Sequence, residues 1–238
     1  MNLISFFLFF WRKISSKNRK FIRDFCKDIW LDVIGANLSK MANVYGTDKH
    51  ELHGYTAIYT LYFDALRKSS FDMLEIGIGG GSNNESGGGS LRMWKKYFPK
   101  AQIIGIDIYD KSFFDEKRIK TFVGDQSDSV FLDALTREYN FEVIIDDGSH
   151  MSFDVVSSFL SLYPKMPSKG LYIIEDIHAC FFDADKKYQG LSSIEFFKSL
   201  IDFIPSCTSK ASFSNEKWLI DTINFIHFYP KMIIIQKK

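Results

Sequence analysis

The segment 71–81 constrains the fold of this chain most, because an apolar run ends there in closely spaced glycines (FDMLEIGIGGG). A short apolar run bounded by turn residues is typical of a buried strand in a parallel sheet. Glycine after such a strand lets the main chain approach a ligand closely, since no Cβ intervenes. Ligands of open α/β sheets bind at this carboxyl edge. The segment therefore predicts a ligand site directly after the first strand.

More short apolar runs follow along the chain, and they alternate with helical patterns. We expect further strands over 103–108, 121–123, 143–146 and 171–174, and helices over 91–97, 130–139, 153–163 and 194–203. This alternation predicts an α/β fold with a mostly parallel sheet and helices on both faces. The chain ends in a predicted antiparallel hairpin, 223–228 and 232–236, which brings the sheet to seven strands. Ser90 is predicted to cap the helix over 91–97.

The first 44 residues are predicted to form an N-terminal helical extension, and residues 45–238 the main domain. Spaced apolar residues over 18–44 indicate two helices that are broken near Gly35, and residues 56–68 show a further helical pattern. A chain of 238 residues suits one α/β domain with an extension.

The start of the chain is apolar over residues 3–11 (LISFFLFFW). The basic residues that follow it are Arg12, Lys13, Lys17, Arg19 and Lys20. A secretory signal carries its positive charges before the apolar part, and this run is far shorter than the ~20 residues that span a bilayer. We interpret it as a helix that packs on the domain or on a second subunit of a homo-oligomer. The alternative is peripheral membrane contact through residues 1–25.

Composition and charge exclude some classes of function. The chain is 46% hydrophobic with a net charge of +1, so nothing draws it towards nucleic acid. Cys26, Cys180 and Cys207 have neither the number nor the spacing of a disulfide framework or a zinc site. A reducing cytoplasm fits this cysteine content, and we expect a cytoplasmic protein, with association to a membrane as the alternative.

The glycine motif Gly77-Ile78-Gly79-Gly80-Gly81-Ser82 departs from the dinucleotide fingerprint, because Ser82 stands where that pattern needs its last glycine. A polar loop over 82–89 also delays the next helix, so no pyrophosphate cradle is evident. We favour S-adenosylmethionine as the ligand, and a simple strand-ending turn is the alternative. Asp107 after the second strand suits ribose hydroxyls, while Asp125 and Gln126 after the third suit the adenine edge. Turn residues are the alternative for all three.

Acidic residues follow two adjacent strands, as Asp146-Asp147 and as Glu175-Asp176. Acids crowded at one site repel each other, and a bound cation relieves this. All-oxygen ligands favour a hard divalent ion, Mg²⁺ first, with Mn²⁺ or Ca²⁺ as the alternatives. His150 is expected to stay unligated and to act as a base near neutral pH. Helix caps and a surface histidine are the alternative.

The polar stretch before the helix over 56–68 is a candidate lid on the ligand, with a solvated loop as the alternative. Its polar residues are Thr47, Asp48, Lys49, His53 and Tyr55.

The set YGTDK…HGY, LEIGIGG…GGGSLRMW, GIDIYDKS, GDQSD, IIDDGSH and LYIIEDIH resembles the metal-dependent macrolide sugar O-methyltransferases. Cephalosporin-hydroxylase-like proteins are related to them. The resemblance covers residues 45 to about 180. It implies a Rossmann-like class I methyltransferase fold that uses S-adenosylmethionine and Mg²⁺.

The resemblance also implies roles for individual residues. It assigns the metal to Asp147, Glu175 and Asp176, and the catalytic base to His150. It assigns cofactor binding to Thr47, Lys49, Tyr55, Glu75, Gly77, Gly79, Asp107, Asp125, Gln126 and Asp146. Ala179 stands where family members often carry Thr, which concerns the acceptor pocket.

The predicted function is therefore Mg²⁺-dependent methyl transfer to a hydroxyl of a sugar or glycoconjugate. The alternatives are a metal-dependent hydroxylase on the same scaffold and a noncatalytic partner subunit with this fold.

Overall fold

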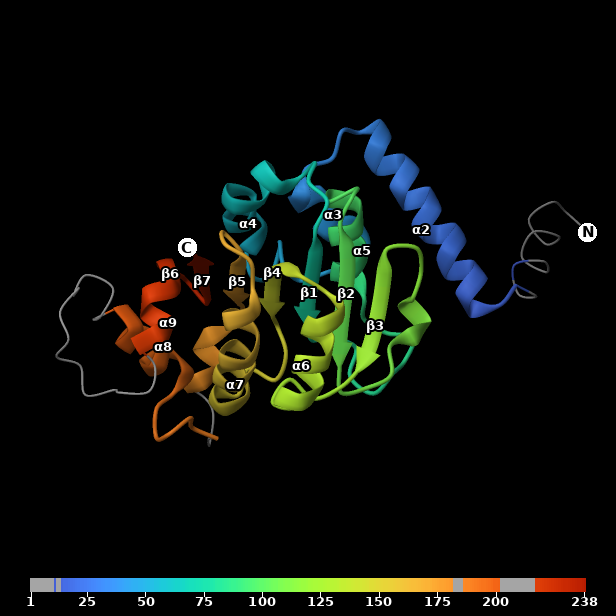
Figure 1. Cartoon of the computed structure of the whole chain (residues 1–238). Coiled ribbons are helices and arrows are strands. Elements are labelled where there is room, and N and C mark those ends of the chain that lie inside the picture. The colour runs from blue at the N-terminus through green and yellow to red at the C-terminus, as the bar shows by residue number, and fades with distance from the viewer. Residues whose placement is uncertain (1–10, 12–13, 182–185, 202–216) are drawn as a thin grey trace, which may run out of the picture.

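A seven-stranded sheet runs through the middle of the protein, with helices on both of its faces (Figure 1). The computed structural model describes residue 11 and residues 14–181, 186–201 and 217–238. The strand order is β3-β2-β1-β4-β5-β7-β6. The strands are β1 Asp72–Ile76, β2 Gln102–Asp107, β3 Ile119–Val123, β4 Phe141–Asp146, β5 Leu171–Ile174, β6 Ile223–Tyr229 and β7 Met232–Lys237.

The first five strands pair in parallel, and β7 and β6 add an antiparallel hairpin. Both confirm the predicted fold class. The chain order reverses at β1, which lies between β2 and β4. Ile76 at the end of β1 pairs with both Ile106 and Asp146, so the strand ends are level across this point. Such a reversal is where open α/β sheets bind ligands.

Each face of the sheet packs against its own set of helices, since successive side chains of a strand point to opposite faces. Met73 lies in the hydrophobic cluster with α3, α4 and α5, while Leu74 lies in the cluster with α6, α7 and α8. The first set is α3 Leu38–Tyr45, α4 Tyr55–Phe63 and α5 Gly89–Tyr97. The second set is α6 Ser129–Glu138, α7 Ser152–Leu162, α8 Ser193–Ile201 and α9 Lys217–Thr222. Short 3₁₀ segments cover Asp64–Leu66, Ser112–Phe114, Tyr163–Lys165 and Ile177–Phe181.

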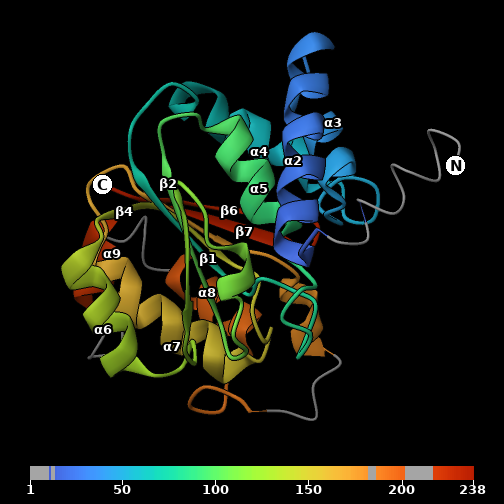
Figure 2. The same cartoon turned by 90° about the vertical axis from the view of Figure 1, so that its right-hand side faces the viewer.

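The helix α2, Ser16–Val33, lies at the end of the molecule away from the hairpin, against α3 (Figures 1 and 2). The break between α2 and α3 falls at Gly35, whose φ of +59° confirms the predicted interruption. Residues 3–10 of the apolar run lie outside the described residues. None of the described helices combines the length and the apolar character that are needed to cross a membrane. The domain division after residue 44 stays a prediction.

Two local predictions were wrong or incomplete. Ser90 does not cap α5, because the helix begins at Gly89 and Gly88 in a left-handed conformation precedes it. The Ser90 hydroxyl instead donates to Glu75 at 2.8 Å. The helix α9 was not predicted. The predicted helix over 194–203 is α8, and residues 202 and 203 lie outside the described residues.

Candidate active site

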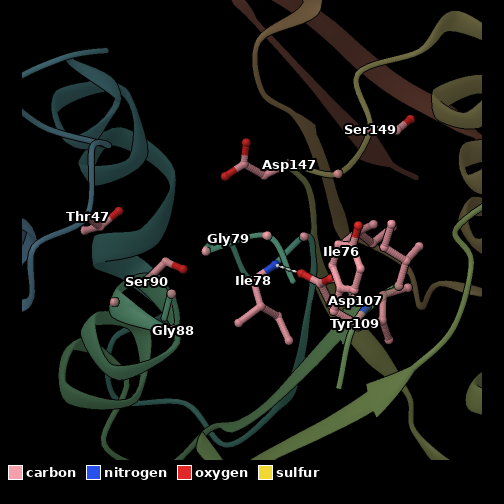
Figure 3. A pocket seen from close by; sticks show the side chains of 18 of the residues that line it. Thr47, Ile76, Ile78, Gly79, Gly88, Ser90, Asp107, Tyr109, Asp147 and Ser149 are labelled. Atoms are coloured by element: carbon pink, nitrogen blue, oxygen red, sulfur yellow. Dashed lines mark hydrogen bonds between the residues drawn. The ribbon is translucent and has the colours of Figure 1, made fainter. Parts of the chain in front are cut away.

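A cavity of about 770 Å³ opens at the carboxyl ends of the parallel strands (Figure 3). Thr47 and Ser90 lie on one side of it, Asp107 and Tyr109 on the other, and Asp147 between them. The predicted site residues that line it are Thr47, Lys49, Gly77, Gly79, Asp107, Asp125, Gln126, Asp147, His150 and Asp176. The remaining predicted residues, Tyr55, Glu75, Asp146 and Glu175, are not part of its lining.

The glycine-rich wall of the cavity depends on one close approach of two main chains. Gly77 has a φ of +85°, and a Cβ there would lie 2.1 Å from the carbonyl oxygen of Asp147. Because a side chain has no room, this approach needs glycine. It brings the end of β1 against the loop that follows β4.

The loop after the glycines is held by a lysine that sequence reasoning missed. Lys111 is 1% exposed, and its ammonium group donates to the carbonyl oxygens of Gly81, Asn83 and Ser86 at 2.7, 2.9 and 3.2 Å. These three bonds hold the loop over 81–86 in place. The motif GIDIYDKS contains Lys111, but a single lysine near a loop gives no sequence signal for such a contact.

Asp107 ties two strand ends together. Its carboxylate accepts from the main-chain N–H groups of Ile78 at 3.0 Å and Tyr109 at 2.9 Å. The first of these bonds is drawn in Figure 3. Asp107 therefore lies at the cavity wall as predicted, and its contact with ribose stays a prediction.

The residues after β3 form bonds within the protein. Asp125 accepts from the main-chain N–H and the hydroxyl of Ser127, both at 2.8 Å, and these bonds lower the pKa of Asp125. The Gln126 amide donates to Asp146 at 3.1 Å and accepts from the main-chain N–H of Ser149 at 2.7 Å. Gln126 thus braces the loop after β4, and the predicted adenine contact stays a prediction.

Asp146 supports the site from behind. Its side chain is buried and accepts from the hydroxyls of Ser158 at 2.6 Å and Tyr172 at 3.3 Å. Burial raises the pKa of Asp146 to about 6, because the charged form loses its hydration. This carboxyl therefore fixes the end of β4 onto α7.

A buried lysine lies among the remaining acids. Lys49 is 1% exposed, and its ammonium nitrogen lies 2.8 Å from Asp147, 2.7 Å from Glu175 and 3.4 Å from Glu75. Burial by itself lowers the pKa of Lys49. The negative charges of Asp147, Glu175 and Glu75 outweigh this and hold the pKa well above its usual range. Sequence reasoning placed Lys49 near the cofactor and missed these ion pairs.

Side chains of two helices donate hydrogen bonds to the buried glutamates. On α5, Ser90 and Trp94 donate to Glu75 at 2.8 and 3.3 Å. On α4, the Tyr59 hydroxyl donates to Glu175. Burial is the main cause that raises the pKa of both glutamates, and the charge of Asp147 adds to it at each of them.

The hydroxyl of Tyr55, one turn before Tyr59 on α4, fixes Asp176 in two ways. It donates to the Asp176 carboxylate at 2.5 Å and accepts from the Asp176 main-chain N–H at 3.2 Å. Residues four apart share one face of a helix, so Tyr55 and Tyr59 reach two consecutive acids. That spacing is a sequence signal that was available for Tyr59.

Asp147, His150 and Asp176 each offer a ligand atom, and these atoms lie within 4.8 Å of one another. Asp147 and Asp176 thus come together as predicted. In this geometry His150 completes the group, while Glu175 is engaged by Lys49 and Tyr59. The carboxylates of Glu75, Asp147, Glu175 and Asp176 outnumber the one ammonium group of Lys49 beside them, so this group of residues suits a hard divalent cation.

His53 also lies beside this group, with Nδ1 3.5 Å from Asp176. It was considered only as a lid residue. Its ring stacks on Tyr55, with the ring centres 5.1 Å apart. His53 and Tyr55 therefore approach Asp176 from the same side.

No family model matches the chain. It is 40% identical over 209 residues to mycinamicin VI 2''-O-methyltransferase of Micromonospora griseorubida, a match that covers 84% of this chain and 52% of that protein. It is 42% identical over 213 residues to demethylmacrocin O-methyltransferase of Streptomyces fradiae, which covers 84% and 53%. The chain therefore spans about half the length of the curated relatives that it matches.

Solved structures of the MycE methyltransferase from the mycinamycin biosynthetic pathway are also similar. The complex with Mg and SAH has a TM-score of 0.78 and 39% identity, covering 85% of this chain and 54% of that one. The complex that also contains mycinamycin VI has a TM-score of 0.76 and 38% identity, with the same coverage.

The sheet order, the antiparallel hairpin and the cavity at the strand ends define a class I S-adenosylmethionine-dependent methyltransferase fold. Within that class, the relatives of this chain are sugar O-methyltransferases. This confirms the resemblance that the motifs indicated.

Proposed function

We propose that this protein is a metal-dependent O-methyltransferase that moves a methyl group from S-adenosylmethionine to a hydroxyl of a sugar. The observation that carries the proposal is the group Asp147, His150 and Asp176, which borders the same cavity as the glycine-rich wall. The names of the relatives support the reaction class. The Mg and SAH held by the MycE structures support both cofactors.

The methyl donor would occupy the part of the cavity between the glycines and Asp107. Gly77 and Gly79 leave the main chain accessible there, and Asp107 would accept from ribose hydroxyls. Asp125 would reach the adenine edge, and Thr47 would face the donor across the cavity. Lys49 and Gln126 would support the donor from the lining itself. Tyr55, Glu75 and Asp146 would give indirect support from behind the lining.

The divalent cation, Mg²⁺ or Mn²⁺, would be held by Asp147 and Asp176, with Glu175 as a further ligand. When bound, it would supply Lewis-acid chemistry that lowers the pKa of the acceptor hydroxyl. His150 would take the hydroxyl proton on a ring nitrogen, and the nearby carboxylates would stabilise the resulting positive charge. A cavity that holds donor and acceptor together also supplies proximity.

The acceptor would be a small-molecule sugar or a glycoconjugate, such as a natural-product sugar or a surface polysaccharide. Ala179 lies in the 3₁₀ segment Ile177–Phe181, which begins directly after the acidic pair Glu175-Asp176 that follows β5. A small side chain at this point would leave more room beside Asp176 than threonine does. A panel of monosaccharide, nucleotide-sugar and oligosaccharide acceptors, assayed for transfer of radiolabelled methyl, tests this substrate class.

Three measurements test the reaction itself. Calorimetric titration should show S-adenosylmethionine binding, and no binding would contradict the donor assignment. EDTA should abolish turnover and Mg²⁺ should restore it, while indifference to EDTA would exclude the cation. His150→Ala should lower kcat by about 10²–10⁴ without changing S-adenosylmethionine affinity. Iron-dependent oxygen uptake would instead favour the hydroxylase alternative.

The N-terminal helix α2 supports a second contact surface. Its exposed large apolar residues include Phe21, Phe25, Trp30 and Val33. We propose that this face packs against a second subunit in a cytoplasmic homo-oligomer, and peripheral membrane contact through residues 1–25 is the alternative. Sedimentation analysis of Phe25→Glu tests the first idea, and co-sedimentation with anionic vesicles tests the second.

A further inference from the structure

Lys49 contacts both the buried and the partly exposed carboxylates of the site. Glu75 and Glu175 are almost completely buried, with side-chain exposures of 0% and 2%, whereas the Asp147 side chain is 23% exposed towards the cavity. The Lys49 ammonium group contacts all three carboxylates. Asp147 also belongs to the group with His150 and Asp176 that suits a divalent cation. One carboxylate therefore faces both the lysine and the proposed metal position.

We propose that Lys49 is a resident counter-cation of the divalent metal site. Its charge holds the carboxylates together when no metal is bound, and it opposes divalent ions through repulsion. This inference rests on the proposed metal-dependent function, and it gives Lys49 a role in setting metal affinity that is separate from any contact with the methyl donor.

The charge balance supports the first half of this role. Without Lys49, the buried carboxylates Glu75 and Glu175 would lose the ammonium group that they share, leaving them to hydrogen-bond donors that carry no charge. Removing one partner of a buried ion pair is strongly destabilising, because the remaining charge has lost its hydration as well. Lys49 is thus expected to stabilise the fold most in the metal-free protein.

The position of the ammonium group supports the second half. It lies 2.8 Å from Oδ2 of Asp147, so the same carboxylate that the cation needs is already neutralised in part. A cation that binds Asp147 must share this carboxylate with Lys49 and accept its repulsion at short range. The lysine therefore lowers the affinity of the site for divalent ions.

Main-chain and side-chain hydrogen bonds hold the segment that carries Lys49. The proposed effect of Lys49 on metal affinity therefore depends on the fold. The Lys49 carbonyl accepts from the Thr56 N–H at the start of α4 at 3.2 Å. Asn43 on α3 donates to Glu51 at 2.9 Å, which holds the other side of the same turn. The lysine is anchored between two helices rather than carried on a free loop.

The test compares Lys49→Met with two control variants. Lys49→Arg keeps the charge, and Lys111→Met removes a second buried lysine, whose hydrogen bonds within the described part of the chain go to carbonyl oxygens. Thermal unfolding is measured in EDTA and in Mg²⁺, and Mg²⁺ affinity is measured by calorimetry. We expect Lys49→Met to unfold at a lower temperature in EDTA, to bind Mg²⁺ at least tenfold more tightly, and to gain more from Mg²⁺ than the wild type. Both controls should keep the Mg²⁺ affinity of the wild type within about threefold.

Equal or weaker Mg²⁺ binding by Lys49→Met, beside a wild type that binds, would overturn this inference and leave the proposed function intact. Absence of Mg²⁺ binding in both proteins would overturn the metal site and the inference together. If Lys49→Met is unfolded without metal, recovery of its fold on adding Mg²⁺ would support the inference, and failure to recover would overturn it.

Discussion

Replacing Gly77 by alanine should separate a steric clash from ordinary backbone strain. The added Cβ would lie 2.1 Å from the Asp147 carbonyl oxygen, in a residue whose φ is +85°. Gly81 offers a matched control, since its φ is +53° and a Cβ there would meet no atom within 4 Å. Both variants carry the same new methyl group on a left-handed residue, and only Gly77→Ala adds the clash.

The size of the difference follows from what must move. A left-handed alanine costs about 1–2 kcal/mol in either variant. In Gly77→Ala the loop must also retreat from β1, which weakens the 2.9 Å bond from the Asp147 N–H to the Ile76 carbonyl. That bond is worth about 1 kcal/mol, and displacing packed neighbours adds about 1–3 kcal/mol. We therefore expect Gly77→Ala to be less stable than Gly81→Ala by at least about 2 kcal/mol.

Guanidinium unfolding of both variants, monitored by circular dichroism, measures this difference in the free energy of unfolding. In thermal unfolding of a chain of this size, about 2 kcal/mol corresponds to a gap of roughly 4–8 °C in Tm. Because the retreating loop carries Asp147, Gly77→Ala should also bind Mg²⁺ more weakly than Gly81→Ala. Unfolding free energies that agree within about 0.5 kcal/mol would refute the steric reasoning.

Three further predictions concern the groups that support the cavity. The pKa of Asp146 is raised to about 6 in the folded state, so the folded protein binds more protons than the unfolded chain between about pH 4 and 6. The contribution of this group to stability is therefore present at low pH and decreases as the pH rises through that window, by about 2–3 kcal/mol, and Asp146→Asn should remove this dependence in pH-resolved unfolding experiments. Lys111→Met should release the loop over 81–86 and weaken S-adenosylmethionine binding about tenfold, which calorimetry would measure. Hydrogen bonds to a charged group contribute about 1.5–3 kcal/mol, and a tenfold loss lies near the lower end of that range. Unchanged affinity would show that binding does not depend on this anchor. Tyr55→Phe should free Asp176 and raise the Mg²⁺ concentration needed for half-maximal activity about fivefold to thirtyfold, as the loss of both hydrogen bonds to Asp176, about 1 kcal/mol each at most, predicts. An unchanged Mg²⁺ dependence would contradict this expectation.

The strands, and the polar residues at their ends, could be predicted from the sequence because apolar runs and the residues that follow them are local features. Gly77, Asp107 and Asp147 lie at the ends of the first, second and fourth strands, which are neighbours in the sheet, and parallel pairing brings these ends to one edge. The direction of individual side chains was less accessible. Gln126 and Asp146 bond to each other within the protein, although both read as ligand contacts when the sequence is taken residue by residue.

Contacts between distant segments were the least accessible. Lys49 meets Glu175 across 126 positions of sequence, and Lys111 meets a loop about 30 positions before it. Neither pair has a fixed spacing in the sequence, because the tertiary fold and not local periodicity brings the partners together. For Lys111 this is the parallel pairing of β1 and β2, which the two segments follow. The Ser90 cap was predicted wrongly for a related reason, since Gly88 starts the helix earlier and Glu75 takes the hydroxyl.

The two-residue period of the strands explains towards which face of the sheet most of the acidic side chains point, which considering each residue separately did not predict. Met73, Ile145 and Ile173 lie in the cluster with α3, α4 and α5, so the residues two positions later, Glu75, Asp147 and Glu175, extend the same face towards Lys49.

By the same count, Asp146 follows Ile144 onto the face of α7, where it bonds to Ser158. Asp176 follows Ile174 and belongs by parity to that opposite face. A left-handed φ of +49° turns it back, and Tyr55 fixes it there. Strand parity therefore predicts the faces of Glu75, Asp146, Asp147 and Glu175. Asp176 departs from it because its backbone is left-handed, and this brings its carboxylate beside that of Asp147.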